Sequence, residues 1–183
     1  MNLEQLCEKQ KELDNQIIQQ HNLHGQNLLP GTVLALQVEL AELANEWQGF
    51  KHWKANPKPK PKLLEEYADG LHFFLSLAIQ KGWEDHLYVY EEAIDDIRED
   101  GFDGGITTAF TEINYWLTKI VIEHEVEKYI VNLSYSKHEF SFKNAWFIFL
   151  SLGIVGFNFT PEQIEEAYLK KNEVNHKRQQ EGY

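Results

Sequence analysis

Residues 36–77 read LQVELAELANEWQGFKHWKANPKPKPKLLEEYADGLHFFLSL, two apolar stretches joined by a segment rich in lysine and proline. In each stretch apolar residues recur at spacings of three and four, which predicts a helix with one buried face. They are Leu36, Leu40, Leu43 and Trp47 in the first stretch, and Leu64, Ala68, Leu71, Leu75 and Ala78 in the second. Because the joining segment is short, we expect the two helices to lie antiparallel and adjacent.

Each of these two helices carries a pair of carboxylates on one face. Glu39 and Glu42 are three residues apart in the first, and Glu66 and Asp69 are three apart in the second. Across a narrow gap the four groups repel one another and need a counter-charge to stay ionised. Hard oxygen ligands in this number suit Mg²⁺, with Mn²⁺ as a substitute, so the pattern predicts a metal site.

A solvated surface is the alternative explanation of these carboxylates, because Glu at i and i+3 commonly marks the exposed face of a helix. The second pair favours the metal site. It is followed by LHFFLSLAI at residues 71–79, a nearly continuous apolar run of the kind found in buried helices.

The composition is that of a folded, globular chain, with 43% hydrophobic and 13% aromatic residues among 183. We expect a single all-α domain over residues 1–183, with residues 84–135 as an inserted or cap region. The formal net charge of −12 argues against nucleic-acid and anionic-membrane partners, which favour basic surfaces. The single Cys7 rules out an internal disulfide.

The apolar run at residues 145–157 is shorter than the roughly 20 residues that a membrane span requires. The N-terminal MNLEQLCEKQ has no signal-peptide core. We therefore expect no membrane association and a cytoplasmic location.

Further helices are predicted over residues 3–20, 107–133 and 142–155 from the spacing of their apolar residues. Thr160-Pro161-Glu162-Gln163 has the pattern of a helix start, with a capping threonine, proline at the first position and Gln three residues on. Thr32, which follows Pro30-Gly31, is the predicted N-cap of the helix that carries Glu39.

Gln10 interrupts the apolar seam of the first predicted helix. One explanation is a buried polar residue that fixes register or the choice of partner. The other is an amide, with one donor and one acceptor group, that pairs with the imide edge of a pyrimidine. Asp14, one turn further on, can share that role.

The last predicted helix presents a polar stripe, because Tyr168, Lys171, Asn175 and Arg178 are three, four and three residues apart. An ammonium, an amide and a guanidinium on one face suit a phosphate chain. Ordinary charge on an exposed helix is the alternative. Lysines also cluster at residues 51–62, and Lys51 lies beside the carboxylate helix, where a cation would attract a polyphosphate.

Three segments resemble the dimeric, all-helical dUTPases, within the all-α nucleoside triphosphate pyrophosphatases. They are the E-x-x-E helix with NEWQGFKHWK at 45–54, the E-x-x-D helix with DGLHFFLSLA at 69–78, and AYLKKNEVNHKRQQEGY at 167–183. The last is similar to that family's closing K-N-x-x-N-x-x-R-Q-x-x-G-Y. Where the family usually has tyrosine in F-K-Y-W, this chain has His52.

The resemblance implies an all-α fold, with a helical bundle core and a helical cap, that assembles as a homodimer. It also implies Mg²⁺-dependent hydrolysis of dUTP, and of dUDP, to dUMP. The carboxylates Glu39, Glu42, Glu66 and Asp69 would hold the metal, with Glu42 as the base. Binding of the nucleotide is implied for the remaining matched positions. Lys171, Asn175, Arg178 and Tyr183 would close over the phosphates. Gln10, with Asp14, would read the uracil. Either Trp47 or Trp53, together with Phe73, would form the walls around base and sugar.

Three alternatives stay open at this point. A related all-α pyrophosphatase acting on another nucleotide, such as dCTP, would keep the carboxylates and differ near Gln10. A carboxylate-bridged di-iron bundle would use two E-x-x-H motifs, for which the chain has Glu173-x-x-His176 and the imperfect match Asp69-x-x-His72. A non-catalytic helical dimer would bind a basic partner in its acidic cleft.

Overall fold

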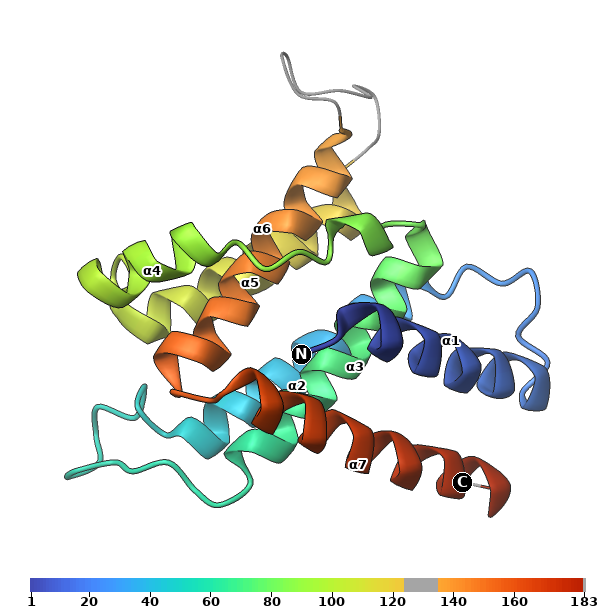
Figure 1. Cartoon of the computed structure of the whole chain (residues 1–183), viewed down its shortest axis with the longest axis horizontal. Helices are drawn as coiled ribbons and strands as arrows, with labels where there is room; N and C mark the ends of the chain where they lie inside the picture. Colours follow the sequence, from blue (N-terminus) through green and yellow to red (C-terminus); the bar gives the residue numbers. More distant parts are fainter. Residues whose placement is uncertain (124–134, 183) are drawn as a thin grey trace. The chain divides into compact units, whose positions relative to one another are not determined.

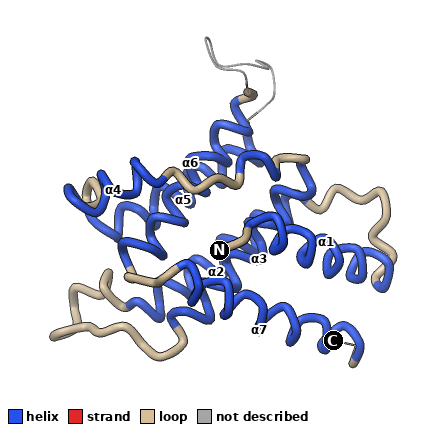
Figure 2. Tube along the Cα trace, viewed as in Figure 1, coloured by secondary structure: helices blue, strands red, loops and turns tan. Residues whose placement is uncertain are grey.

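The computed structural model describes residues 1–123 and 135–182, and within these it contains seven α-helices and no strand (Figure 1, Figure 2). The predicted all-α fold is confirmed. The helices are α1 (Leu3–Gln20), α2 (Leu29–Trp47), α3 (Leu63–Lys81), α4 (Glu91–Asp100), α5 (Gly105–Ile122), α6 (Lys137–Ser151) and α7 (Pro161–Gln180). A 3₁₀ turn, η1 (Glu84–His86), and a π-helical turn, η2 (Leu152–Gly156), complete the list.

The chain forms two compact units, Met1–Glu84 with Thr160–Tyr183, and Asp85–Phe159. The first unit is therefore discontinuous in sequence, and it contains α1, α2, α3 and α7. The second is continuous and contains α4, α5, α6 and η2. The prediction of one domain with an insertion at 84–135 stays a prediction.

Helix α3 is the centre of the first unit, and it packs against α2, α1 and α7. Its buried residues are on all sides, which is why the run that follows Asp69 is apolar almost throughout. Helices α2 and α3 are antiparallel, as predicted: Gln80, near the end of α3, donates to Thr32, near the start of α2. The Lys60 N–H, just before α3, donates to the Glu46 carbonyl at the end of α2.

The starts of two helices show how local chemistry sets their boundaries. The predicted capping box before α7 is present: the Thr160 hydroxyl accepts from the Gln163 N–H, and the Gln163 side chain accepts from the Thr160 N–H. The prediction that Thr32 caps α2 is wrong, because α2 begins at Leu29 and contains Pro30 in its first turn. Proline is tolerated there, since the first N–H groups of a helix have no partner within it.

In the second unit α5 packs along α6. Helix α6 begins at Lys137, earlier than the predicted residue 142, because Ser136 and Glu139 form a capping box. At its other end the helix passes into the π-helical turn η2. The predicted helix over 107–133 corresponds to α5 as far as Ile122, and its residues 124–133 lie outside the described part of the chain.

Within residues 1–123 and 135–182, no single helix is both long and apolar enough to cross a membrane. Among these described helices, only a pair that is bent at a short break, Lys137–Gly156 and Pro161–Gln180, has the necessary length and apolar composition when the two are taken together.

Candidate active site

The first unit contains a pocket of about 460 Å³ to which α1, α2, α3 and α7 all contribute. It brings together most of the predicted site residues, although they lie far apart in the sequence. Those that line it are Gln10, Asp14, Glu39, Glu42, Glu66, Asp69, Phe73, Lys171, Asn175 and Arg178. Because both α2 and α7 meet α3, the two carboxylate pairs and three members of the polar stripe of α7, Lys171, Asn175 and Arg178, face the same space, whereas the fourth member, Tyr168, is buried and does not line the pocket.

Three other predicted residues do not line this pocket. Trp47 ends α2, and Lys51 and Trp53 lie in the loop that follows it. Lys51 lies over the Phe50 ring, with its ammonium 5.3 Å from the ring centroid, and the Trp53 side chain is 64% exposed. Tyr183 lies outside the described residues. Roles for these four in nucleotide binding stay predictions.

Carboxylate oxygens of Glu39, Glu42 and Glu66 lie within 4.8 Å of one another. Glu42 is exposed, whereas Glu39 and Glu66 are half-buried, so the cluster sits at the edge of the pocket. Oxygen ligands at this spacing, open to solvent on one side, fit a small hard cation that keeps part of its water shell. The residues present therefore fit Mg²⁺.

Burial and crowding raise the pKa values of two of these carboxyl groups, Glu39 and Glu66. Burial, followed by the negative charges of Asp69, Glu42 and Glu66, raises the pKa of Glu39 to about 7. The pKa of Glu66 is raised by burial and then by the charges of Asp69 and Glu42. A divalent cation at the cluster would remove this repulsion.

Asp69 has a different partner. Its Oδ2 lies 2.6 Å from the Lys171 Nζ, and the Glu65 carboxylate lies 3.6 Å from the same ammonium. Burial raises the pKa of Asp69, while its hydrogen bond with Lys171 acts in the opposite direction. Burial lowers the pKa of Lys171, but its contacts with Asp69 and Glu65 outweigh this and raise it. Lys171 thus supplies positive charge to a strongly acidic pocket.

A buried polar network closes the α1 end of the pocket. The Gln10 amide nitrogen donates to Asp14 at 2.8 Å and to Ser76 at 2.9 Å, and the Ser76 hydroxyl donates to Asp14 at 2.8 Å. The Gln10 carbonyl oxygen lies 2.7 Å from His72 Nδ1 and 2.9 Å from the Tyr168 hydroxyl. Every hydrogen-bonding position of this amide is used, so Gln10 can contact a base only by giving up one of these bonds.

His72 carries its proton on Nδ1, because the Gln10 oxygen it faces is an acceptor. Burial lowers its pKa to about 3, so the ring is neutral at physiological pH. Within the described structure, His72 Nε2 and Asp14 Oδ2 are buried without a hydrogen-bond partner. Both atoms are acceptors in residues that line the pocket, but neither is exposed, so a ligand could reach them only after neighbouring side chains move.

The network also includes residues whose role the sequence did not reveal. His72 and Ser76 follow Asp69 by three and seven residues, so all three share one face of α3. That spacing, inside an otherwise apolar run, is the signal that could have identified them.

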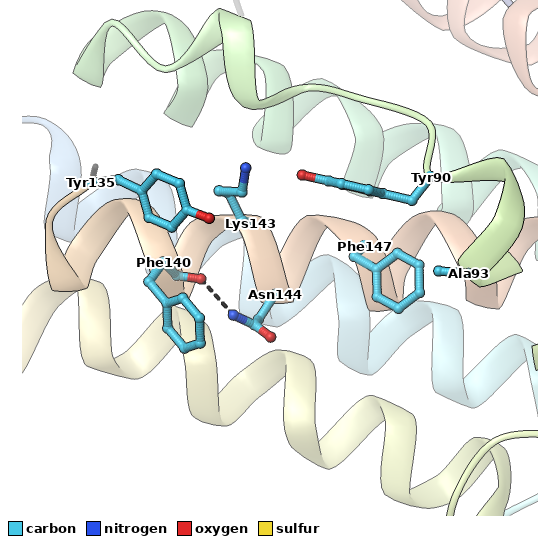
Figure 3. A pocket seen from close by; sticks show the side chains of 7 residues that line it. All are labelled: Tyr90, Ala93, Tyr135, Phe140, Lys143, Asn144 and Phe147. Carbon is cyan, nitrogen blue, oxygen red and sulfur yellow. Dashed lines mark hydrogen bonds between the residues drawn. The ribbon is translucent and has the colours of Figure 1, made fainter. Parts of the chain in front are cut away.

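The second unit has a pocket of its own, of about 300 Å³, with a different chemistry (Figure 3). Its walls are aromatic, and the Lys143 ammonium lies 4.7 Å from the Tyr135 ring centroid and 5.7 Å from that of Tyr90. Among the described residues that line it, none is a carboxylate. It does not fit a divalent cation, and the acidic pocket of the first unit is the candidate active site.

Fold and pocket together define a class of protein: an all-α protein with an acidic pocket, suited to a hard cation, beside a buried polar network. A family model described as dUTPase matches residues 2–183, nearly the whole chain, so the chain belongs to the dUTPase family. It is a dUTP diphosphatase, an enzyme that hydrolyses dUTP. No curated protein matches the chain.

The family confirms the resemblance to the dimeric all-α dUTPases that the sequence motifs indicated. It does not favour the alternative of a pyrophosphatase for another nucleotide. Nor does it favour a di-iron protein or a non-catalytic binding module, because the dUTPase family model matches nearly the whole chain.

Proposed function

We propose that the enzyme hydrolyses dUTP, and also dUDP, to dUMP in a Mg²⁺-dependent reaction, with Mn²⁺ as a substitute metal. The observation that carries the proposal is the cluster of Glu39, Glu42 and Glu66 oxygens within 4.8 Å of one another, in a pocket that also contains Lys171 and Arg178. Acidic groups for a metal and cations for phosphates are the two components that phosphate hydrolysis requires.

In this proposal Glu39, Glu42, Glu66 and Asp69 hold the metal. Bound Mg²⁺ would supply charge neutralisation at the phosphate oxygens and a lowered pKa for a coordinated water. Glu42 is the exposed member of the three-carboxylate cluster, and we assign it the role of accepting the proton of the attacking water. Lys171, Asn175 and Arg178 bind the phosphates, and Lys171 and Arg178 stabilise the charge on the leaving group.

We place the uracil at the α1 end of the pocket, between Gln10, Asp14 and the ring of Phe73. Two features support this placement. His72 and Asp14 have unpaired buried acceptors there, which a base could reach once neighbouring side chains move, and the N3–H of uracil is a donor. The N3 of cytosine carries a lone pair instead, and it would meet these acceptors unfavourably.

A nucleotide panel tests the proposal. Release of pyrophosphate from dUTP, dTTP, dCTP, dATP, dGTP and UTP, and of phosphate from dUDP, is measured with Mg²⁺, with Mn²⁺ and with EDTA. We expect turnover of dUTP and dUDP that EDTA abolishes. Turnover of dUTP that persists in EDTA would remove the metal from the proposal. No turnover of dUDP would restrict the substrate to the triphosphate.

The carboxylates are tested by Glu42→Gln, with Glu12→Gln on the exposed face of α1 as the matched change of charge. Glu42→Gln should abolish hydrolysis and leave the fold intact, because it relieves repulsion within the cluster. Glu12→Gln should leave both unchanged. Unfolding of Glu42→Gln would show that the cluster is structural instead.

We also propose that the enzyme is a homodimer. Leu34 and Val38 lie one turn apart on α2, and their side chains are 63% and 48% exposed, so they form an apolar face that a second copy would cover. Light scattering after size-exclusion chromatography should give twice the chain mass. Leu34→Glu should shift the mass towards that of a single chain, whereas a monomeric wild type would remove the proposal.

A further inference from the structure

We propose that Lys171 acts as an internal counter-ion that occupies the place of the metal at Asp69, so that metal binding releases Lys171 for the phosphates. Metal binding and nucleotide binding are then coupled through the movement of one side chain. The inference rests on the proposed function, because it assumes that the carboxylate cluster binds a divalent cation.

The Lys171–Asp69 contact is a short, largely buried ion pair in the pocket. The Lys171 Nζ lies 2.6 Å from the Asp69 Oδ2, and the side chains are 15% and 13% exposed. A hydrogen bond between two charged groups at this distance and burial is strong, and breaking it without replacement leaves both charges poorly solvated. Each partner therefore needs a substitute before the pair can open.

Asp69 is the predicted metal ligand that stands apart from the others. The described carboxylates that lie close enough for one cation are Glu39, Glu42 and Glu66, and Asp69 is not part of that group. It nevertheless belongs to the same electrostatic cluster, because its charge acts on both Glu39 and Glu66. Asp69 is thus close to the cluster but engaged with the lysine.

A divalent cation at Asp69 would repel the ammonium strongly at such short range. Two other partners could then bind the Lys171 ammonium. Glu65, on the same helix as Asp69 and 51% exposed, lies 3.6 Å from the ammonium and can hold it at the mouth of the pocket. The phosphates of a nucleotide would provide the second, stronger partner. The metal replaces Lys171 at Asp69, and the phosphate replaces Asp69 at Lys171.

Coupling of this kind is reciprocal. Metal should strengthen the contact of the enzyme with the phosphates beyond the charge that the metal itself adds, because it frees Lys171. Nucleotide should strengthen metal binding to the same extent, because it draws Lys171 away from Asp69. Lysine suits the role, since its single ammonium on a flexible chain can change partners by rotating side-chain bonds.

The direct test is the chemical reactivity of the Lys171 amine in the wild-type enzyme, measured by amine acetylation and mass spectrometry. Lys170, the exposed neighbour on α7, is the internal reference. We expect slow modification of Lys171 without metal, at least about fivefold faster modification with Mg²⁺, and protection when a non-hydrolysable dUTP analogue is added with Mg²⁺. The rate at Lys170 should not change.

A second measurement follows Mn²⁺ binding by electron paramagnetic resonance, without nucleotide. Removing the competing ammonium in Lys171→Met should raise the affinity for Mn²⁺ about tenfold, whereas Lys170→Met should leave it unchanged. This outcome is opposite to what a residue that assists metal binding would give. It also requires no turnover, so it is independent of any loss of activity in the variant.

The outcomes separate the two proposals. If Mn²⁺ does not bind the wild-type enzyme, or binds equally well to Glu42→Gln, the metal site itself is wrong. If Mn²⁺ binds and the reactivity of Lys171 does not change with metal, the metal site stands and the displacement of Lys171 is refuted. An unchanged or weakened Mn²⁺ affinity in Lys171→Met would likewise refute it.

Discussion

Replacing Glu39 by Gln should stabilise the protein at alkaline pH and have almost no effect in acid. Burial and the neighbouring carboxylates raise the pKa of Glu39 from its ordinary value of 4.5 to about 7 in the folded protein. A carboxyl group with a raised folded pKa contributes stability below its unfolded pKa, and this contribution is lost as the pH rises through the folded value. Above pH 7 the ionised Glu39 therefore costs stability, and a neutral glutamine of the same shape does not.

The size of the effect follows from the shift. At 1.36 kcal/mol for each pH unit, the displacement from 4.5 to about 7 corresponds to an upper value of about 3 kcal/mol. Glu39 is only half-buried, so solvent screens much of the repulsion, and about 1 kcal/mol is the expected gain at pH 8. For a chain of this size that gain raises the midpoint of thermal unfolding by about 2–4 °C.

The assay is urea unfolding in EDTA at pH 4, 6 and 8, for the wild type, Glu39→Gln and Glu12→Gln. The free energy of unfolding of Glu39→Gln should equal that of the wild type at pH 4 and exceed it at pH 8. Glu12→Gln, on an exposed helical face, should show no such pH dependence. The electrostatic reasoning would be refuted if Glu39→Gln were less stable than the wild type at pH 8, or if its free energy of unfolding differed from that of the wild type by the same amount at all three pH values.

Three further predictions concern the metal, the polar network and a helix cap. Because metal binding requires Glu39 to lose its proton, Mn²⁺ affinity measured by electron paramagnetic resonance should rise about tenfold from pH 6 to pH 8, and a flat profile would contradict the raised pKa. Gln10→Leu should cost about 2–3 kcal/mol in urea unfolding, because it leaves the His72 N–H without its acceptor, and Asp14 and Ser76 without the amide donor, whereas Tyr168 retains the Leu6 carbonyl; a cost of about 0.5 kcal/mol or less would show that the network adds little. Thr160→Ala should lower the free energy of unfolding by about 1 kcal/mol through loss of the cap of α7, and Thr160→Ser should retain it.

The central part of the first unit could be predicted from the sequence because it depends on local spacing. A three-residue interval places Glu39 with Glu42, and Glu66 with Asp69, whatever the rest of the chain does. The short linker then makes α2 and α3 antiparallel neighbours, so the carboxylates meet. The capping box at Thr160 is equally local, and the structure contains it as predicted.

Contacts that depend on how distant segments dock could not be predicted in the same way. Lys171 meets Asp69 across 102 residues, and Gln10 meets His72 across 62. The sequence indicated that Lys171 and Asp69 belong to one site, but it assigned them to phosphate and metal and gave no sign of their ion pair. The prediction for Thr32 was wrong for another reason. Threonine after Pro30-Gly31 suits an N-cap, but the helix begins earlier, at Leu29, and includes Pro30.

The division of the first unit between residues 1–84 and 160–183 has a consequence for biosynthesis. On the ribosome α1, α2 and α3 emerge early, but Ile164 and Tyr168 of α7, which are fully buried in the finished unit, follow only after residues 85–159 have been made. Until then the apolar surface that α3 offers to α7 is uncovered, and Asp69 has no lysine beside it. The second unit is continuous and can complete its own core first, so the acidic pocket is the last part of the described molecule to be assembled.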